Sequence, residues 1–174
     1  MDRRGKAQRK SRPLYSEDER VRRDKSPWTL VQGVLAPLQF LVFLVSLFLV
    51  LRYLQTGAGL AAATASIVVK TVALYAIMIT GSLWERDVYG RYLFAPAFYW
   101  EDVVSMLVLG LHTAYLVVLI ADSLPPHQQM LLALAAYAAY LVNAIQFLVK
   151  FRRARLQAAY RDAPTSLPAW ETAA

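Results

Sequence analysis

The chain has 174 residues, of which 57% are hydrophobic and 18% are charged, and its formal net charge is +7. This hydrophobic share is high for a soluble domain. The chain has no cysteine, which excludes disulfides, thiol nucleophiles and cysteine-ligated metals. The sequence also has no zinc-binding, P-loop, dinucleotide-binding or Ser-His-Asp pattern, so we do not expect a hydrolase, an NTPase or a nicotinamide-dependent enzyme.

The positive charge is concentrated near the two ends of the chain. Ten Lys and Arg residues lie in residues 1–25, and five lie between Lys150 and Arg161. Nucleic-acid binding is one interpretation of such tails, but contact with an anionic membrane surface explains them better. We therefore expect no nucleic-acid partner. We expect residues 1–25 to be a basic tail, disordered or a frayed surface helix, and residues 158–174 to be disordered.

Four long apolar blocks fill most of the chain between these tails. Each has about the 20 residues that a helix needs to cross the hydrocarbon core of a bilayer. Four such blocks cannot be covered by the little chain that remains, so they do not indicate a soluble core. The sequence predicts an all-α integral membrane bundle over residues 26–157, with four spans at about 28–53, 65–84, 99–121 and 129–149.

The basic residues also predict the orientation of the bundle. They lie in the N-terminal tail, in the 85–95 loop and in the C-terminal tail, whereas the other two loops hold almost none apart from Arg52. Basic residues flanking a span favour the cytoplasmic side. We therefore expect both termini to be cytoplasmic.

Two adjacent carboxylates, Glu101 and Asp102, open the third apolar block, and His112 follows inside it. An unpaired charge at the edge of the hydrocarbon is costly, so such residues normally mark function or tight pairing. At 100° per residue, Glu101 and His112 share one face of the helix with Ser105 and Tyr115, within about 80°. Asp102 points about a quarter turn away.

Asp102 is therefore expected to face a different neighbour, and a pairing with Arg86 or Arg91 is the alternative to a site role. His112 has three interpretations: a packing residue, an axial ligand to the metal of a tetrapyrrole, or an acid-base group. Lys70 either snorkels or pairs with a carboxylate. Snorkelling is favoured because Lys70 lies only about one to two turns from the expected start of its helix.

Polar residues from all four spans reach the depth of the cytoplasmic leaflet. Their distances from the span ends, at about 1.5 Å per residue, are similar, so they are candidates for one shared site. They are Gln32, Gln39, Glu85, Glu101, Asp102, Asn143 and Gln146.

Several short blocks of the sequence resemble the 3-vinyl bacteriochlorophyllide hydratase family of bacteriochlorophyll synthesis. The resemblance covers about residues 14–157, and its specificity comes from the order of the blocks and the four-span frame. The blocks are Trp28-Thr29-Leu30-Val31-Gln32, Leu35-Ala36-Pro37-Leu38-Gln39-Phe40, Gly81 with Trp84-Glu85, Phe94-Ala95-Pro96-Ala97-Phe98, Trp100-Glu101-Asp102, and Tyr140-Leu141-Val142-Asn143-Ala144 with Gln146-Phe147.

The resemblance implies a hydro-lyase that adds water to the C3 vinyl group of chlorophyllide a or a 3-vinyl bacteriochlorophyllide, giving a 1-hydroxyethyl group. It implies a multi-pass protein of the bacterial inner membrane, cytoplasmic or intracytoplasmic photosynthetic. The expected partners are the magnesium tetrapyrrole substrate, water and the lipid bilayer, together with a second copy of the chain or other pigment-synthesis enzymes. We expect no cofactor and no protein-bound metal.

Hydration of an unactivated vinyl group requires a proton first, and then attack of water on the ring-stabilised cation. The acid must keep its proton near neutral pH, which apolar surroundings favour. Glu101 is the candidate acid, and Asp102 or Glu85 would place the water.

The candidate substrate-binding residues are His112, as an axial ligand of the substrate magnesium, and Asn143, Gln146, Gln39, Trp84, Trp100 and Arg91. The alternative function is a non-enzymatic membrane protein that binds or assembles pigment, with His112 as the ligand.

Overall fold

The computed structural model describes residues 14–162 and consists, within them, of helices without strands. All helices except α1 are long and apolar enough to cross a membrane. The prediction of an all-α protein with four spanning helices is therefore confirmed. The helices are α1 (Glu17–Lys25), α2 (Pro27–Thr56), α3 (Leu60–Tyr89), α4 (Tyr99–Ala121) and α5 (Pro126–Asp162).

Three of the spanning helices are longer than the apolar blocks indicate. The turn between α2 and α3 has only three residues, 57–59, whereas the sequence predicted a loop over 54–64. Gly57 and Gly59 adopt left-handed backbone with φ of 70° and 87°, a conformation that costs glycine little. Helix α3 therefore begins five residues earlier than expected, and α5 continues to Asp162 instead of ending near residue 149.

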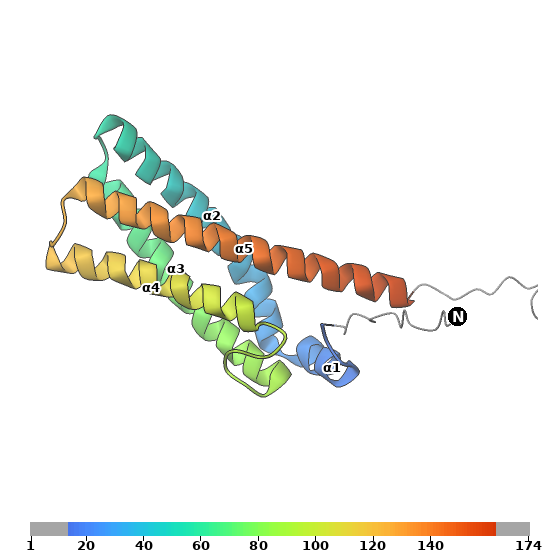
Figure 1. Ribbon diagram of the computed structural model, residues 1–174. Coiled ribbons are helices and arrows are strands. Elements are labelled where there is room, and N and C mark those ends of the chain that lie inside the picture. Colours follow the sequence, from blue (N-terminus) through green and yellow to red (C-terminus); the bar gives the residue numbers. More distant parts are fainter. Residues whose placement is uncertain (1–13, 163–174) are drawn as a thin grey trace, which may run out of the picture.

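The four long helices form two antiparallel pairs, as Figure 1 shows: α2 packs chiefly on α3, and α4 on α5. The pairs meet through contacts of α2 with α5 and of α3 with α4. This arrangement brings α1, the loop 90–98 and the last part of α5 from Lys150 onward to one end of the bundle, here called the basic end. The turns 57–59 and 122–125 lie at the opposite end.

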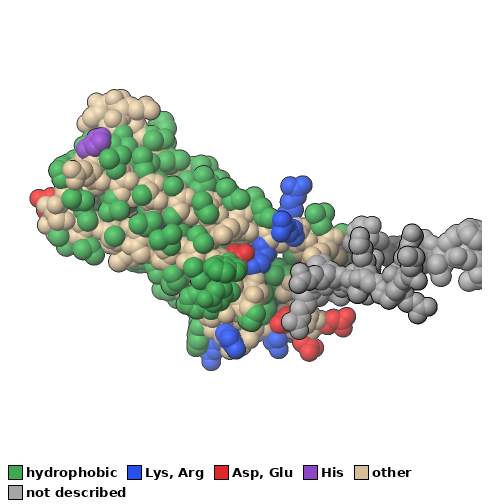
Figure 2. All heavy atoms as spheres, in the orientation of Figure 1, with side chains coloured by type: hydrophobic (Ala, Val, Ile, Leu, Met, Phe, Trp, Pro, Cys, Tyr) green, Lys and Arg blue, Asp and Glu red, His purple; other side chains and the backbone are tan. Residues whose placement is uncertain are grey.

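Large apolar side chains cover the outside of the bundle. Leu30, Ile120 and Leu148 are 74%, 84% and 69% exposed, and Figure 2 shows hydrophobic side chains over the whole visible length of the helices. On this face the Lys and Arg side chains gather at the basic end. Polar residues are buried between the helices instead. Since water would disfavour such a surface, the chain is a multi-pass membrane protein.

Helix α1 is capped and anchored to the bundle, whereas the sequence predicted a disordered tail or a frayed helix. Ser16 and Glu19 form a reciprocal capping box, which satisfies the free N–H groups of the first turn. Arg22 Nε donates to the Val88 carbonyl oxygen and Ser26 Oγ to Asp87, each at 2.8 Å. The disorder expected for residues 1–13 and 163–174 lies outside the described residues.

Candidate active site at the basic end

The carboxyl groups of Glu85 and Asp102 make a hydrogen bond with each other at the basic end. Glu85 lies near the end of α3 and Asp102 in the first turn of α4, and only 4% and 6% of these residues are exposed. Two ionised carboxylates are acceptors only and cannot bond to each other. Such a bond therefore requires a proton on one of the two carboxyl groups. Glu85 Oε2 is buried, and no N–H group within residues 14–162 donates to it.

The loop before α4 fixes Asp102 in place. Phe94 N–H donates to Asp102 Oδ2 at 2.7 Å, and Phe94 has a φ of 59°. Left-handed backbone in a non-glycine residue costs about 1–3 kcal/mol and clusters at functional sites. The predicted alternative, a pairing of Asp102 with Arg86 or Arg91, is wrong. The Arg86 guanidinium, on α3, lies over the Tyr92 ring at 5.0 Å, and Arg91 in the following loop is exposed.

Glu101, the neighbouring carboxylate, faces a different helix. It forms an ion pair with Lys150 of α5, and the Lys150 ammonium also lies 4.7 Å from the centre of the Phe98 ring. The prediction that the two acids face different neighbours is confirmed. The predicted face of α4 is confirmed as well, because Glu101, Ser105, His112 and Tyr115 are all buried. An ion-paired carboxylate is an acceptor without a proton to give, so Glu101 and the Glu85–Asp102 pair are suited to different tasks.

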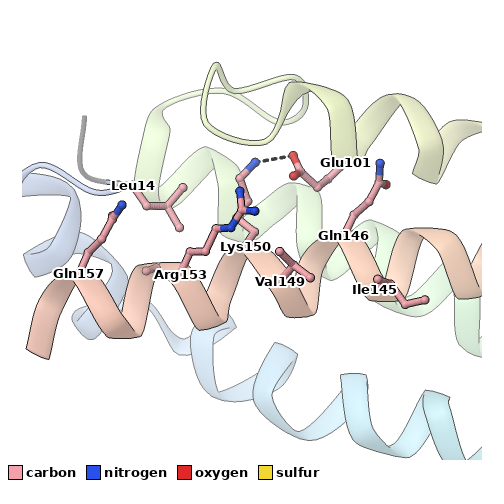
Figure 3. Close-up of a pocket in the computed structure, with 9 residues that line it drawn as sticks. Leu14, Glu101, Ile145, Gln146, Val149, Lys150, Arg153 and Gln157 are labelled. Carbon is pink, nitrogen blue, oxygen red and sulfur yellow. Dashed lines mark hydrogen bonds and ion pairs between the residues drawn. The ribbon is translucent and has the colours of Figure 1, made fainter. Parts of the chain in front are cut away.

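A groove with a volume of about 420 Å³ opens beside the ion pair (Figure 3). Figure 3 shows Lys150 and Arg153 on one helix face with Gln146, and Glu101 reaching Lys150 from the opposite side. The groove combines two cations and two amides with an apolar wall. Such a lining suits a flat apolar molecule that carries an anionic group. Its residues are Leu14, Glu101, Ile145, Gln146, Val149, Lys150, Arg153, Ala154 and Gln157.

The Glu85–Asp102 pair lies behind this groove. Lys150 lines the groove and interacts electrostatically with both carboxyl groups of the pair. An aromatic cluster closes the same region: Phe98 contacts Trp84, Phe147 and Phe151 with ring centres 5.6, 6.0 and 5.9 Å apart. Neither carboxyl group lines the groove itself, so Lys150 is the link between the pair and the groove.

The predicted substrate-binding residues are spread over several places. Gln146 lines the groove, and its Oε1 has no partner among residues 14–162. Asn143, one turn deeper, donates to Ser105 Oγ at 2.8 Å. Trp84 packs inside and donates to Thr29 Oγ1 at 3.0 Å. Gln39 is buried between the helices, whereas Trp100 and Arg91 are exposed outside the groove.

His112 and Lys70 lie deep in the bundle, away from the groove. Both are fully buried, and neither lines the groove. The prediction that Lys70 snorkels is wrong, and so is its alternative, a carboxylate partner: the ammonium lies 3.8 Å from the Tyr140 ring centre. Because α3 begins at Leu60, Lys70 is about 15 Å from the helix start, too deep for its side chain to reach the opposite interface.

Sequence reasoning missed Lys150 as part of the site and treated it only as the basic end of a span. A signal was present, since Lys150 follows Asn143 by seven residues and Gln146 by four. These spacings place all three on one helix face. Arg153 continues that face three residues later.

A family model described as 2-vinyl bacteriochlorophyllide hydratase matches residues 15–153. The curated protein of that name from Rhodobacter capsulatus is 62% identical over 152 residues, which cover 87% of this chain and 88% of the relative. The one from Cereibacter sphaeroides is 63% identical over 145 residues, covering 83% and 90%. No solved structure matches this chain. The match includes both carboxyl groups of the pair, most residues of the groove, α2 to α4 and α5 as far as residue 153, and the chain belongs to the vinyl bacteriochlorophyllide hydratase family, as the resemblance implied.

Proposed function

We propose that this protein adds water to the vinyl group of chlorophyllide a or a 3-vinyl bacteriochlorophyllide and releases the 1-hydroxyethyl pigment. Membership of a family whose relatives carry the hydratase name supports this activity. The structural observation that carries this proposal is the buried Glu85–Asp102 hydrogen bond, because it requires a proton close to Lys150, which lines a groove that suits a tetrapyrrole.

The reaction sets two requirements for the protein. A proton must be added to the terminal vinyl carbon, which leaves a cation on the carbon next to the macrocycle, where conjugation stabilises it. A water molecule then attacks that carbon and returns one proton. The net change is one water added, so the same group can give the first proton and be restored by the second.

We assign the proton to the Glu85–Asp102 pair rather than to Glu101. The pair carries the proton that its hydrogen bond requires, as in other sites where two carboxyl groups share one proton. Glu101 is held by Lys150 and lines the groove, which suits an acceptor that orients the attacking water. This reassignment keeps the three predicted carboxylates and exchanges their roles.

The groove supplies binding for the anionic edge of the substrate. Arg153 is exposed at its mouth, and a guanidinium binds a carboxylate such as the pigment's propionate well. Ile145 and Val149 provide apolar contact for the ring, and Gln146 Oε1 is free to accept a hydrogen bond. His112 does not line the groove and lies deep in the bundle, so we assign it no contact with the substrate magnesium. The names of the relatives favour a hydratase over the alternative of a pigment-binding protein.

The basic end belongs on the cytoplasmic side in this proposal. The lysines and arginines gather there, in agreement with the positive-inside rule. The protein would then work in the bacterial inner membrane or its intracytoplasmic photosynthetic extension, and receive an amphipathic pigment at the cytoplasmic leaflet.

The test compares three carboxyl-to-amide variants in membranes supplied with chlorophyllide a in ¹⁸O-labelled water. Glu85→Gln and Asp102→Asn should lower kcat about 100-fold or more, the scale of general acid catalysis, and labelled oxygen should appear only in the hydroxyethyl product. Glu101→Gln should lower kcat less, by about 10-fold. The matched control is Asp87→Asn, an exposed carboxylate two residues from Glu85, which should leave kcat unchanged. Near-normal turnover in both Glu85→Gln and Asp102→Asn would refute the assigned acid.

A further inference from the structure

Lys70 is the least satisfied charge in the described part of the bundle. It is fully buried near the middle of α3, and its Nζ has no hydrogen-bond partner among residues 14–162. Its Nζ lies over the Tyr140 ring, 3.8 Å from the ring centroid. A ring face attracts a cation but cannot accept the three hydrogen bonds that an ammonium offers. A buried amino group left in this state is costly whether it is charged or neutral, because its hydrogen bonds are not made, so we expect a further partner.

His112 also has a buried atom without a described partner, at nearly the same depth as Lys70. Its Nδ1 donates to the Val108 carbonyl oxygen at 2.8 Å, which makes Nε2 an acceptor in the neutral ring. Nε2 is buried and has no partner within the described residues. The His112 ring lies 5.8 Å from Tyr137, three residues from the tyrosine under Lys70, so the two groups are separated by about one helical turn.

Further unpartnered atoms lead from these two residues toward the groove. Asn143 Oδ1 and Gln39 Nε2 are both buried without a partner in the described chain. Asn143 lies one turn from Tyr140 on α5, and Gln39 one turn from Phe43, which contacts the same Tyr140 ring. These residues form what we call the polar seam: Gln39, Lys70, Ser105, His112, Asn143 and Gln146, the last of which lines the groove.

The chemistry of the polar seam identifies its ligand. Lys70 and the Gln39 amide nitrogen are donors, whereas His112 Nε2 and Asn143 Oδ1 are acceptors. An anion would leave the acceptors unpaired, and a metal cation would be repelled by the Lys70 ammonium. Water both donates and accepts, and a buried water normally has two to four such polar partners. Nearly all buried polar atoms in proteins have a hydrogen-bond partner, either another protein group or an ordered water.

We propose that the polar seam is a hydrated path that binds water between Lys70 and His112 and connects it with the groove at the basic end. The interior of the bundle then contains water along the polar seam, which receives side chains from all four long helices, although its outer surface faces lipid. Water binding does not depend on the proposed function. A supply of reactant water from this path does rest on it.

Because the chain has no cysteine, single cysteines can report water directly. A thiol reacts with silver ion, which is small enough to follow water, only where water lets it ionise. Ser105→Cys lies in the polar seam. Val142→Cys, next to Asn143 but 53% exposed to lipid, is the control at the same depth, and Ala133→Cys, buried in the apolar core, is the control for a dry interior.

Ser105→Cys in membranes should react at least about 100-fold faster than both controls, and Lys70→Met in the same background should slow it about 10-fold by removing the donor that holds the water. If Ser105→Cys does not accumulate, Asn143→Cys on the facing helix gives the same measurement. Reaction of the seam cysteine no faster than Val142→Cys would overturn the path, whatever the enzyme does.

The supply role has a separate kinetic test. Lys70→Met alone should lower kcat about 10-fold with KM for the pigment unchanged, because Lys70 lies outside the groove. An increase in KM with kcat unchanged would make Lys70 a contact of the pigment and overturn the supply role. Neither result would affect the roles of Glu85 and Asp102.

Discussion

The basic end and the middle of the bundle treat buried charge in opposite ways. At the basic end Glu101 is paired with Lys150, and Glu85 is bonded to Asp102. In the middle, Lys70 has an aromatic ring and His112 a single backbone carbonyl. A fold that needed only stability would show the first pattern throughout, because an unpaired charge opposes burial. The proposed water site accounts for this difference, because water would supply the hydrogen bonds that Lys70 lacks among the described residues.

Lys150→Met, at the basic end, should lower the free energy of unfolding more than any other single variant considered below. Removing the ammonium leaves the Glu101 carboxylate buried without its partner, and breaking a buried pair from one side costs about 3–5 kcal/mol. The residues keep some exposure, so we expect the free energy of unfolding to fall by about 2–3 kcal/mol after discounting for screening. Unfolding in mixed micelles with increasing dodecyl sulfate, followed by circular dichroism, measures it.

The double variant Glu101→Gln/Lys150→Met is the control for this loss. It removes both charges, so it should be more stable than Lys150→Met alone. If the single and double variants unfold alike, the lysine stabilises through its contact with Phe98 and not through Glu101.

Lys70→Met should raise the free energy of unfolding, whereas Lys150→Met lowers it. Methionine fills a similar volume without a charge to bury, so we expect the bundle to gain about 1–2 kcal/mol, reduced by the lost contact with the Tyr140 ring. The neighbouring control is Thr71→Val, which removes a buried hydroxyl that already donates to the Ile67 carbonyl oxygen at 2.8 Å. Thr71→Val should be neutral or slightly destabilising. Destabilisation by Lys70→Met would show that Lys70 is satisfied by the fold itself.

The sequence also predicted the spans and helix faces better than the partners of the buried charges. Apolar block length fixed the four spans, and helical phase separated Glu101 from Asp102, because both depend on local geometry within one helix. The partners of these acids depend on which helices meet. Nothing local in α4 indicates that Asp102 would bond to Glu85 of α3, or that Lys150 would return to Glu101 after 49 residues of chain.

The error at Lys70 has a local origin. Lys70 was placed too near an interface because residues 60–64 were assigned to a loop on the strength of two glycines, whereas these glycines need only a three-residue turn. The capping box at Ser16 and Glu19 was also readable and would have predicted α1. Depth errors of one turn matter more in a membrane than in water, because they decide whether a charge can reach an interface.

Gly90→Ala tests whether the backbone conformation of the turn after α3 contributes to stability at the basic end. Gly90 ends the helix with a φ of 75° and a Cβ there would meet open space, so the cost is backbone strain alone, about 1–2 kcal/mol. Gly33→Ala in α2 is the matched control, since its Cβ also meets open space but its backbone is helical. It should stabilise the helix by about 0.5–1 kcal/mol. In the same unfolding assay, Gly90→Ala should lower the free energy of unfolding and Gly33→Ala should raise it. Equal effects would contradict backbone strain at position 90.

Trp84→Phe should have the smallest effect at the basic end, and its size separates packing from hydrogen bonding there. Phenylalanine keeps an aromatic ring beside Phe98 but loses the bond from Trp84 Nε1 to Thr29 Oγ1. One such bond contributes about 1 kcal/mol, and Thr29 keeps its own bond to the Arg23 carbonyl oxygen. Trp100→Phe, at a ring 69% exposed, should change stability by less than about 0.5 kcal/mol. If the two variants unfold alike, the link from α3 to α2 adds nothing to the basic end, and the Glu85–Asp102 pair depends on the loop 90–98 alone for its position.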